Sequence, residues 1–181
     1  MRLFIAVDLD ERLQRVVADR IGDLRRLLAA SGIDDHVRWV ATEQLHLTLH
    51  FIGYVDDQQA GLIRAALEPG LTSPPCRLSL AGMGAFPTSG AARVIWLGAD
   101  AGADALRAVY QEVSARLKKA GCSPEEREFR AHLTIGRVRK PDRRLTHRML
   151  RGLSLDPSGE DRKSTRLNSS HSAKSRMPSS A

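Results

Sequence analysis

The sequence predicts a single α+β domain whose strands are largely antiparallel. Apolar, β-rich segments alternate with amphipathic ones in the order strand, helix, strand, strand, helix, strand, strand, helix, strand. A chain of 181 residues, 42% of them hydrophobic, is long enough for one domain with a sizeable core. A strand–helix–strand–strand unit also runs twice, so the domain contains a weak internal repeat.

The first half of the chain is expected to contain three strands and two helices. Strands are indicated by short apolar, β-branched runs, and helices by apolar residues that recur at spacings of three and four. In order, the expected elements are a strand at 2–8, a helix capped by Asp10 and ending near Ser31–Gly32, strands at 37–40 and 45–52, and a helix from Asp56–Asp57 to Pro69–Gly70.

The second half is expected to repeat this pattern and then to become basic. Arg77–Leu80 and Arg93–Leu97 are typical of strands, and the Gly-, Pro- and Ser-rich segment between them predicts a loop. A helix is expected over Leu106–Leu117, ended by Gly121, and a strand over Phe129–Val138. The basic segment Arg139–Arg151 follows.

The composition excludes several classes of protein. No stretch approaches the roughly 18 consecutive apolar residues of a membrane-spanning helix. Acidic residues follow the N-terminal apolar run at once, which argues against a signal peptide. Two cysteines, Cys76 and Cys122, are too few for a disulfide framework and lack the spacing of metal ligands. We therefore expect a cytoplasmic monomer that does not bind membranes.

Residues 161–181 differ in composition from the rest of the chain. They contain seven serines and carry +4 of the formal net charge of +7, which predicts a disordered tail. The strings DRKSTRLNSSH and SRMPSSA in this tail resemble two parts of a translated short-read sequencing adapter. We therefore expect a domain over residues 1–160 that is truncated at its C-terminus. The alternative is a natural Ser/Arg-rich tail that binds RNA.

Two strands share a short polar motif. The first, HLTLH, begins at His46, and the second, HLTI, begins at His132. Because side chains alternate along a strand, His46, Thr48 and His50 are expected on one face, and His132 and Thr134 are expected to share a face in the same way. Each strand thus presents an imidazole beside a hydroxyl, and its apolar residues face the core.

The repetition of the motif favours function over simple tolerance of polar residues. A single His-x-Thr is usually structural, because both residue types fit the polar face of a half-buried strand. With six histidines and seven threonines in the chain, chance predicts about 0.2 such matches. Two occur, in nearly identical apolar surroundings.

Two imidazoles with two hydroxyl donors suit attack on a phosphodiester. Histidine has an ordinary pKa of about 6.5, so that near neutral pH one ring can accept a proton while another donates one. Threonine hydroxyls can donate hydrogen bonds to phosphate oxygens without adding charge. Such chemistry needs no metal or cofactor, and the motifs lack the accompanying Asp, Glu or Cys that would favour a histidine-ligated metalloenzyme.

The paired motifs resemble those of the 2H phosphoesterase superfamily and, more closely, of the RNA 2′,3′-cyclic phosphodiesterases, also called 2′-5′ RNA ligase-like proteins. The resemblance covers residues 1 to about 140. It is carried by HLTLHFIG, FRAHLTIGRV, MRLFIAVDL, RWV five residues before HLTL, Phe86–Pro87 and VIWLG. It implies two pseudo-symmetric lobes of antiparallel sheet with flanking helices around a central groove, and hydrolysis of RNA 2′,3′-cyclic phosphate ends to 2′-phosphomonoesters.

The resemblance also implies roles for the motif residues. His46 would be the proton donor to the departing 3′-oxygen, and His132 would be the proton acceptor that activates water. Thr48 and Thr134 would bind the phosphate. Arg137 matches an arginine of the family, but strand parity places it opposite His132 unless the strand bulges, so a structural salt bridge is the alternative to phosphate contact. Arg130 has the parity of His132 and is a second candidate for substrate binding.

The chain departs from the family in two places that affect the site. Ala131 stands where the family often has proline, and His50 stands where lysine or arginine is common. We expect His50 to be a groove-edge residue rather than a catalytic one. If the tail is an adapter, the last strand of the family is missing, and an unpaired sheet edge is expected.

Other polar and aromatic residues are expected to be structural. His36 and His147 are expected to be solvated, and Trp39 and Trp96 to lie in the core. Phe86 is a candidate for stacking on a base. The basic segment 139–151 could follow RNA phosphates, although most such runs are solvated surface.

Three functional alternatives remain beside hydrolysis of RNA ends. The same groove could join RNA ends through a 2′-5′ linkage, or it could act on small cyclic nucleotides. The domain could also be a non-catalytic RNA-binding module, for which salt-sensitive binding without turnover would be the sign.

Overall fold

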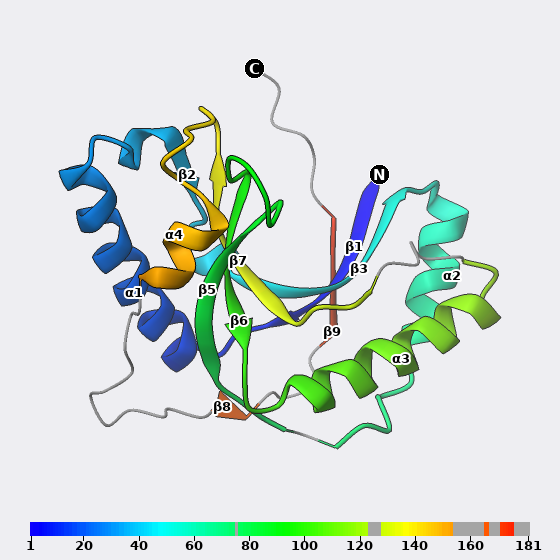
Figure 1. The fold of residues 1–181 in the computed structure, drawn as a ribbon. Helices are drawn as coiled ribbons and strands as arrows, with labels where there is room; N and C mark the ends of the chain where they lie inside the picture. Colours follow the sequence, from blue (N-terminus) through cyan, green and yellow to red (C-terminus); the bar gives the residue numbers. More distant parts are fainter. Residues whose placement is uncertain (75, 123–127, 154–164, 167–170, 176–181) are drawn as a thin grey trace.

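The computed structural model describes residues 1–74, 76–122, 128–153, 165–166 and 171–175. The predicted α+β class is confirmed, with helices flanking an antiparallel sheet (Figure 1). The elements follow the order β1 (Arg2–Asp8), α1 (Glu11–Ala30), η1 (Asp34–His36), β2 (Val37–Trp39), η2 (Thr42–Gln44), β3 (His46–Tyr54), α2 (Asp57–Leu67), β4 (Arg77–Leu78), β5 (Leu80–Phe86), β6 (Val94–Ala99), α3 (Ala103–Lys119), β7 (His132–Val138), α4 (His147–Gly152), β8 (Thr165–Arg166) and β9 (His171–Ser175).

The main sheet brings the two motif strands together at its centre. Its strand order is β5-β6-β7-β3-β1-β9, and β2 pairs with β7 as well. All of these pairings are antiparallel. In Figure 1, α1 lies on the left of the sheet, whereas α2 and α3 lie on the right. The repeated unit of the sequence therefore becomes two neighbouring groups of strands that meet at β3 and β7.

The helices follow from their apolar stripes and their caps. Asp10 caps α1 as predicted, since its carboxylate accepts a hydrogen bond of 2.8 Å from the Leu13 backbone N–H. Asp56 begins α2 with a capping box that it forms with Gln59. Their buried residues join those of α3 and the sheet in one core, so the helices are held mainly by burial of one face.

Strand β5 lies where the sequence predicts a loop, because glycine and alanine occupy four of its seven positions. Leu80–Phe86 nevertheless pair with β6. A Cβ atom on Gly84 would lie 2.5 Å from the Trp96 ring and 2.7 Å from the His147 ring. The packing of these two large rings over the strand thus requires glycine here, and the same glycine hides the strand pattern.

The sequence predicts an unpaired sheet edge without naming the strand, and in the structure β1 is covered by a further strand. Strand β9 pairs with β1 in antiparallel register, from Leu3 with Ser175 to Val7 with His171. Part of the segment expected to be disordered therefore forms strands, β8 and β9. Residues 161–164, 167–170 and 176–181 lie outside the described residues.

Candidate active site

The two motif strands lie side by side and present their polar residues on one face. Leu47 pairs with Leu133, and both leucines are buried. In this antiparallel register His46 lies across from Thr134, and Thr48 lies across from His132. We call this side of the sheet the histidine face. Directly opposed residues of such a pair are about 5 Å apart and diagonal neighbours about 7–8 Å apart, so the two imidazoles can flank one phosphate.

Both histidines are anchored in the same way. Nδ1 of His46 lies 2.7 Å from the carbonyl oxygen of Gln44, and Nδ1 of His132 lies 2.6 Å from that of Arg130. A carbonyl can only accept a hydrogen bond, so Nδ1 carries a proton in both rings. The other nitrogen, Nε2, is then the atom that gains or loses a proton in acid–base chemistry.

Aromatic rings flank each histidine. Phe4 of β1 stacks on His46 with ring centroids 4.9 Å apart. Phe86 of β5 meets His132 edge-on at 5.2 Å, and Trp96 of β6 lies 6.3 Å from the same ring. Trp96 pairs with Thr134 and therefore shares the histidine face, which corrects the prediction that it is a core residue. These rings restrict the orientation of both imidazoles.

A β-bulge in β3 removes His50 from the histidine face. Thr48 pairs with Ala6 but His50 pairs with Ile5, so one residue of β3 is extra and the alternation is shifted. His50 is only 3% exposed. Its Nε2 lies 3.0 Å from Ser114 Oγ, and its ring stacks on Tyr110 at 4.3 Å. The expectation of a groove-edge residue is therefore wrong, and burial lowers the pKa of His50.

An equivalent bulge in β7 brings Arg137 onto the histidine face. Trp96 pairs with Thr134 but Ile95 pairs with Gly136, so Ile135 is the extra residue. Arg137 is exposed and pairs with Val94, which follows the parity of Trp96. The strand parity that placed Arg137 on the opposite face is thus corrected by the bulge, and no salt bridge joins its guanidinium to a described residue.

Arg130, the other candidate arginine, is held by a neighbouring acid. Its guanidinium donates hydrogen bonds of 3.0 and 3.2 Å to Glu128 Oε2. Both side chains are exposed. Its backbone carbonyl anchors His132, so this residue supports the site through its main chain.

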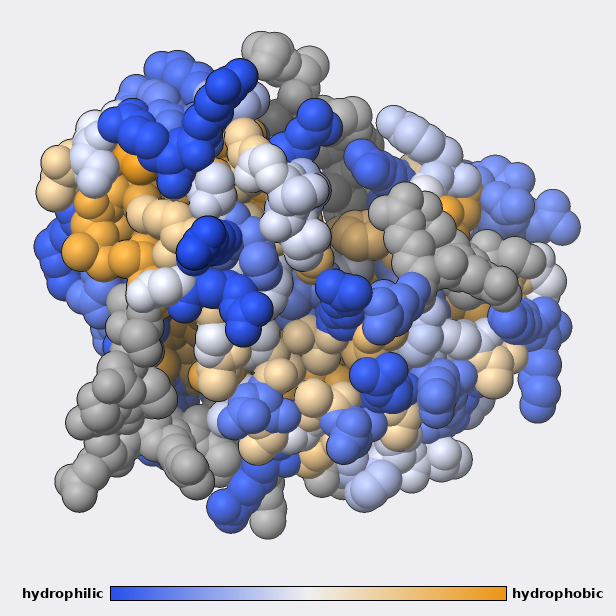
Figure 2. Space-filling view, in the orientation of Figure 1, coloured by the Kyte–Doolittle hydropathy of each residue, from blue (hydrophilic) through white to orange (hydrophobic). Residues whose placement is uncertain are grey.

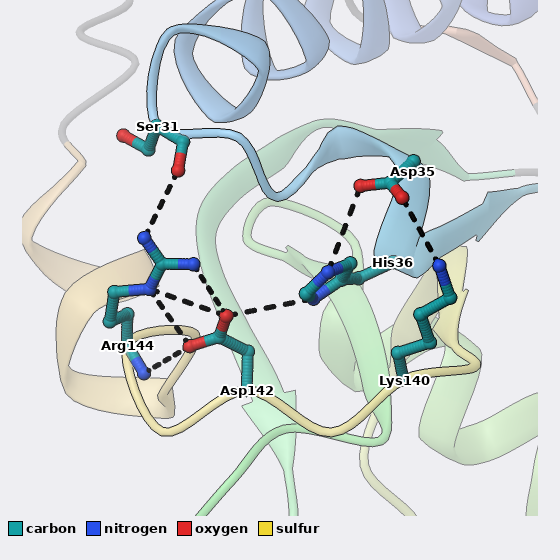
Figure 3. Close-up of polar contacts among 6 residues, drawn as sticks. All are labelled: Ser31, Asp35, His36, Lys140, Asp142 and Arg144. Atoms are coloured by element: carbon teal, nitrogen blue, oxygen red, sulfur yellow. Dashed lines mark hydrogen bonds and ion pairs between the residues drawn. The ribbon is translucent and has the colours of Figure 1, made fainter.

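The two histidines expected to be solvated are instead structural. His36 is 21% exposed and lies between two carboxylates, with Nε2 3.7 Å from Asp35 and Nδ1 3.5 Å from Asp142 (Figure 3). His147 of α4 accepts a hydrogen bond of 3.0 Å from the Ala85 backbone N–H. Each of them therefore joins segments that are distant in the sequence.

The positive charge of the basic segment after β7 is partly neutralised by Asp35 and Asp142. Lys140 Nζ donates to Asp35 at 3.2 Å, and Arg144 donates to Asp142 at 2.7 Å and to the Ser31 carbonyl at 3.1 Å (Figure 3). Hydrogen bonds from Arg144 lower the pKa of Asp142 to about 2. These contacts fasten the segment to the turn before β2, so Lys140 and Arg144 are structural in this state.

The described part of the chain contains neither a cluster of metal ligands nor a membrane-spanning helix. Within it, no group of three or more His, Cys, Asp or Glu side chains is placed to hold a metal ion. No described helix is long and apolar enough to cross a membrane. The space-filling view shows hydrophilic and apolar residues intermixed over the visible side (Figure 2).

The fold and the twin motif strands define a class of phosphoesterase built on two His-x-Thr strands. Within this class, the profile of the 2′-5′ RNA ligase superfamily matches residues 13–159, and the chain belongs to this superfamily. A relative from Archaeoglobus fulgidus, named RNA 2′,3′-cyclic phosphodiesterase, is 34% identical over 88% of this chain and 85% of its own length. A relative of the same name from Thermotoga maritima is 36% identical over 77% and 71%.

Solved structures show the same architecture. TT0787 of Thermus thermophilus superposes with a TM-score of 0.66 at 26% identity, covering 80% of this chain and 78% of that one. E. coli LigT complexed with 3′-AMP superposes with a TM-score of 0.61, also at 26% identity, covering 80% and 76%. The resemblance noted in the sequence is thereby confirmed.

Proposed function

We propose that this chain hydrolyses RNA 2′,3′-cyclic phosphate ends to 2′-phosphomonoesters by acid–base catalysis with two histidines. The observation that carries the proposal is the pair of imidazoles on adjacent strands, each with Nδ1 fixed on a backbone carbonyl. The enzymatic activity is supported by the relatives named RNA 2′,3′-cyclic phosphodiesterase.

In the proposed reaction, water attacks phosphorus in line with the bond to O3′. Nε2 of His132 takes a proton from the water as the new oxygen–phosphorus bond forms. The bond between phosphorus and O3′ breaks, and Nε2 of His46 gives its proton to O3′. The product keeps the phosphate on O2′, and proton exchange with solvent restores both imidazoles.

The phosphate is held by neutral and cationic donors. Thr48 and Thr134 lie directly across from the opposite histidines, so their hydroxyls are placed to donate to non-bridging oxygens. The bulge supports Arg137 as a further phosphate ligand, since it brings this guanidinium to the same face. Arg130, held by Glu128, is the weaker candidate of the two arginines.

The test is an assay on an oligonucleotide that ends in a 2′,3′-cyclic phosphate. Incubation with EDTA, with and without a second oligonucleotide bearing a 5′-hydroxyl, separates the activities. We expect a 2′-phosphate product that forms equally well with the chelator present. A joined product would favour 2′-5′ ligation, and salt-sensitive binding without turnover would favour an RNA-binding module.

The proposal places the enzyme in the cytoplasm as a monomer acting on RNA. The monomer is supported by a site in which one chain supplies both histidines and their anchoring carbonyls. The reducing compartment is supported by Cys76 and Cys122, which are both free thiols. Sedimentation of the purified protein tests the oligomeric state, and a dimer would contradict it.

A further inference from the structure

Two arginines face each other across β2 and β7. Arg38 pairs directly with Arg137, between the pairs Val37 with Val138 and Trp39 with Gly136. Val37 is buried, and a Cβ on Gly136 would contact both Val37 and Trp39. Since neighbouring residues of a strand point to opposite sides, Arg38 and Arg137 point away from that packing, onto the histidine face. Both are exposed.

This pair of like charges has no acid to balance it within the described part of the chain. No hydrogen bond or ion pair joins either guanidinium to a described residue. Lys140 and Arg144, only a few residues further on, are each held by a carboxylate. Like charges at directly opposed positions destabilise a strand pair, so an anion between the two guanidiniums would remove this cost.

The arginine pair adjoins the proposed catalytic residues. Along β7, Arg137 follows Thr134 with only the bulge between them. On the neighbouring strand, the Val40 backbone N–H donates to the Ile135 carbonyl at 3.0 Å, so the chain runs along β7 from Arg38 toward His46. The pair therefore lies beyond the His46–Thr134 end of the site, on the same face.

The backbone that carries Arg38 is fixed in place. The Arg139 backbone N–H donates to the His36 carbonyl at 2.7 Å. The cluster of Asp35, His36 and Lys140 ties the start of β2 to the end of β7 (Figure 3). The two guanidiniums are thus held on a rigid strand pair, which lowers the ordering cost of binding an anion.

We propose that Arg38 binds a second phosphate of the RNA, the phosphodiester next to the cyclic end, and that the Arg137 guanidinium lies between this phosphate and the cyclic one. The inference rests on the proposed function, because the neighbouring anion is identified from the cyclic phosphate at the histidines. Guanidinium groups suit phosphate oxygens in charge and geometry. A mononucleoside cyclic phosphate lacks this second phosphate, so the site makes RNA ends better substrates than small cyclic nucleotides.

The test compares two substrates in the variants Arg38→Gln and Arg107→Gln. The substrates are cytidine 2′,3′-cyclic phosphate and a trinucleotide that ends in the same group. In Arg38→Gln we expect KM for the trinucleotide to rise about ten-fold, with the mononucleotide unchanged. Arg107 is exposed on α3, so its variant removes the same charge elsewhere and should change neither value. If KM rises equally for both substrates in Arg38→Gln, or rises for neither, the inference is overturned.

A binding measurement separates this inference from the proposed function. Fluorescence anisotropy with a trinucleotide ending in a 3′-phosphate requires no turnover. Loss of one phosphate contact should reduce the slope of log affinity against log salt by about 0.7. A wild type that binds but hydrolyses neither substrate would contradict the proposed function alone. Unchanged affinity and slope in Arg38→Gln would contradict the second-phosphate site, whatever the activity.

Thermal unfolding of Arg38→Gln tests whether a change in KM or affinity comes from a loss of folded structure. Replacing Arg38 by glutamine relieves the repulsion across the strand pair. The unfolding midpoint of the free protein should therefore be equal to or above that of the wild type. A clear drop would indicate that Arg38 is a structural residue and would overturn its assignment to substrate.

Discussion

At the scale of single residues, the backbone carbonyls of Gln44 and Arg130 hold Nδ1 of His46 and His132, which leaves Nε2 of each ring for the proposed proton transfers. Replacing either His46 or His132 by alanine should lower kcat by about 10²- to 10⁴-fold, because each ring supplies general acid or base catalysis. The measurement is single-turnover hydrolysis of a cyclic-ended oligonucleotide across pH, where the wild type should give a bell-shaped profile. Full activity in either variant, with an unchanged unfolding midpoint, would rule out the mechanism.

At the scale of elements, the two bulges decide which side chains reach the histidine face. Gly136 directly follows the extra residue of the β7 bulge and pairs with β2, where a Cβ would come within 2.8 Å of Val37 Cγ1. Gly136→Ala should therefore destabilise the fold by about 1–3 kcal/mol. The matched control is Gly61→Ala in α2, where no atom lies within 4 Å of the added methyl group, and stability should hold or rise. Chemical denaturation measures both, and equal effects would contradict this packing.

The bulge in β3 also makes the packing of β3 against α3 sensitive to pH. Burial holds the pKa of His50 below its ordinary value of 6.5. Below about pH 6.5 this histidine is protonated in the unfolded chain but stays neutral in the folded one. The free energy of unfolding should therefore fall as the pH drops below about 6.5. His50→Gln should show a smaller fall over the same range, measured by denaturation at pH 7.5 and 5.5. Identical pH dependence in both proteins would remove His50 as its source.

At the scale of the whole molecule, the sequence predicts correctly the positions that depend on one strand alone. The period of two places His46, Thr48, His132 and Thr134 on shared faces, because these residues precede the bulges. It fails at His50 and at Arg137, because a bulge is set by the partner strand and leaves no mark in a strand's own pattern. Strand β5 is not predicted for a similar reason, since Gly84 is required by the rings of Trp96 and His147 from other elements.

The C-terminal segment affects the whole sheet, because its strand β9 covers the edge formed by β1. The superfamily match ends at residue 159, and the identity of residues 161–181 as a translated adapter stays a prediction. We expect sequencing of the gene to diverge from this chain near Glu160. A genomic stop codon directly after Ala181 would contradict the proposal and leave β9 as the natural partner of β1.

The similarity of the two His-x-Thr strands limits how many molecules can hold the required pattern of protons. Catalysis in one direction needs a proton on one chosen imidazole and none on the other. For two independent groups of equal proton affinity, at most about a quarter of the molecules hold that arrangement at any pH, and mutual repulsion of the two charged rings raises this limit to about a half. A share above a half requires unequal neighbours, and the residues that follow the two bulges, Phe51 and Arg137, differ in charge. Duplication supplies the reacting groups twice, and their different tasks depend on such unmatched side chains.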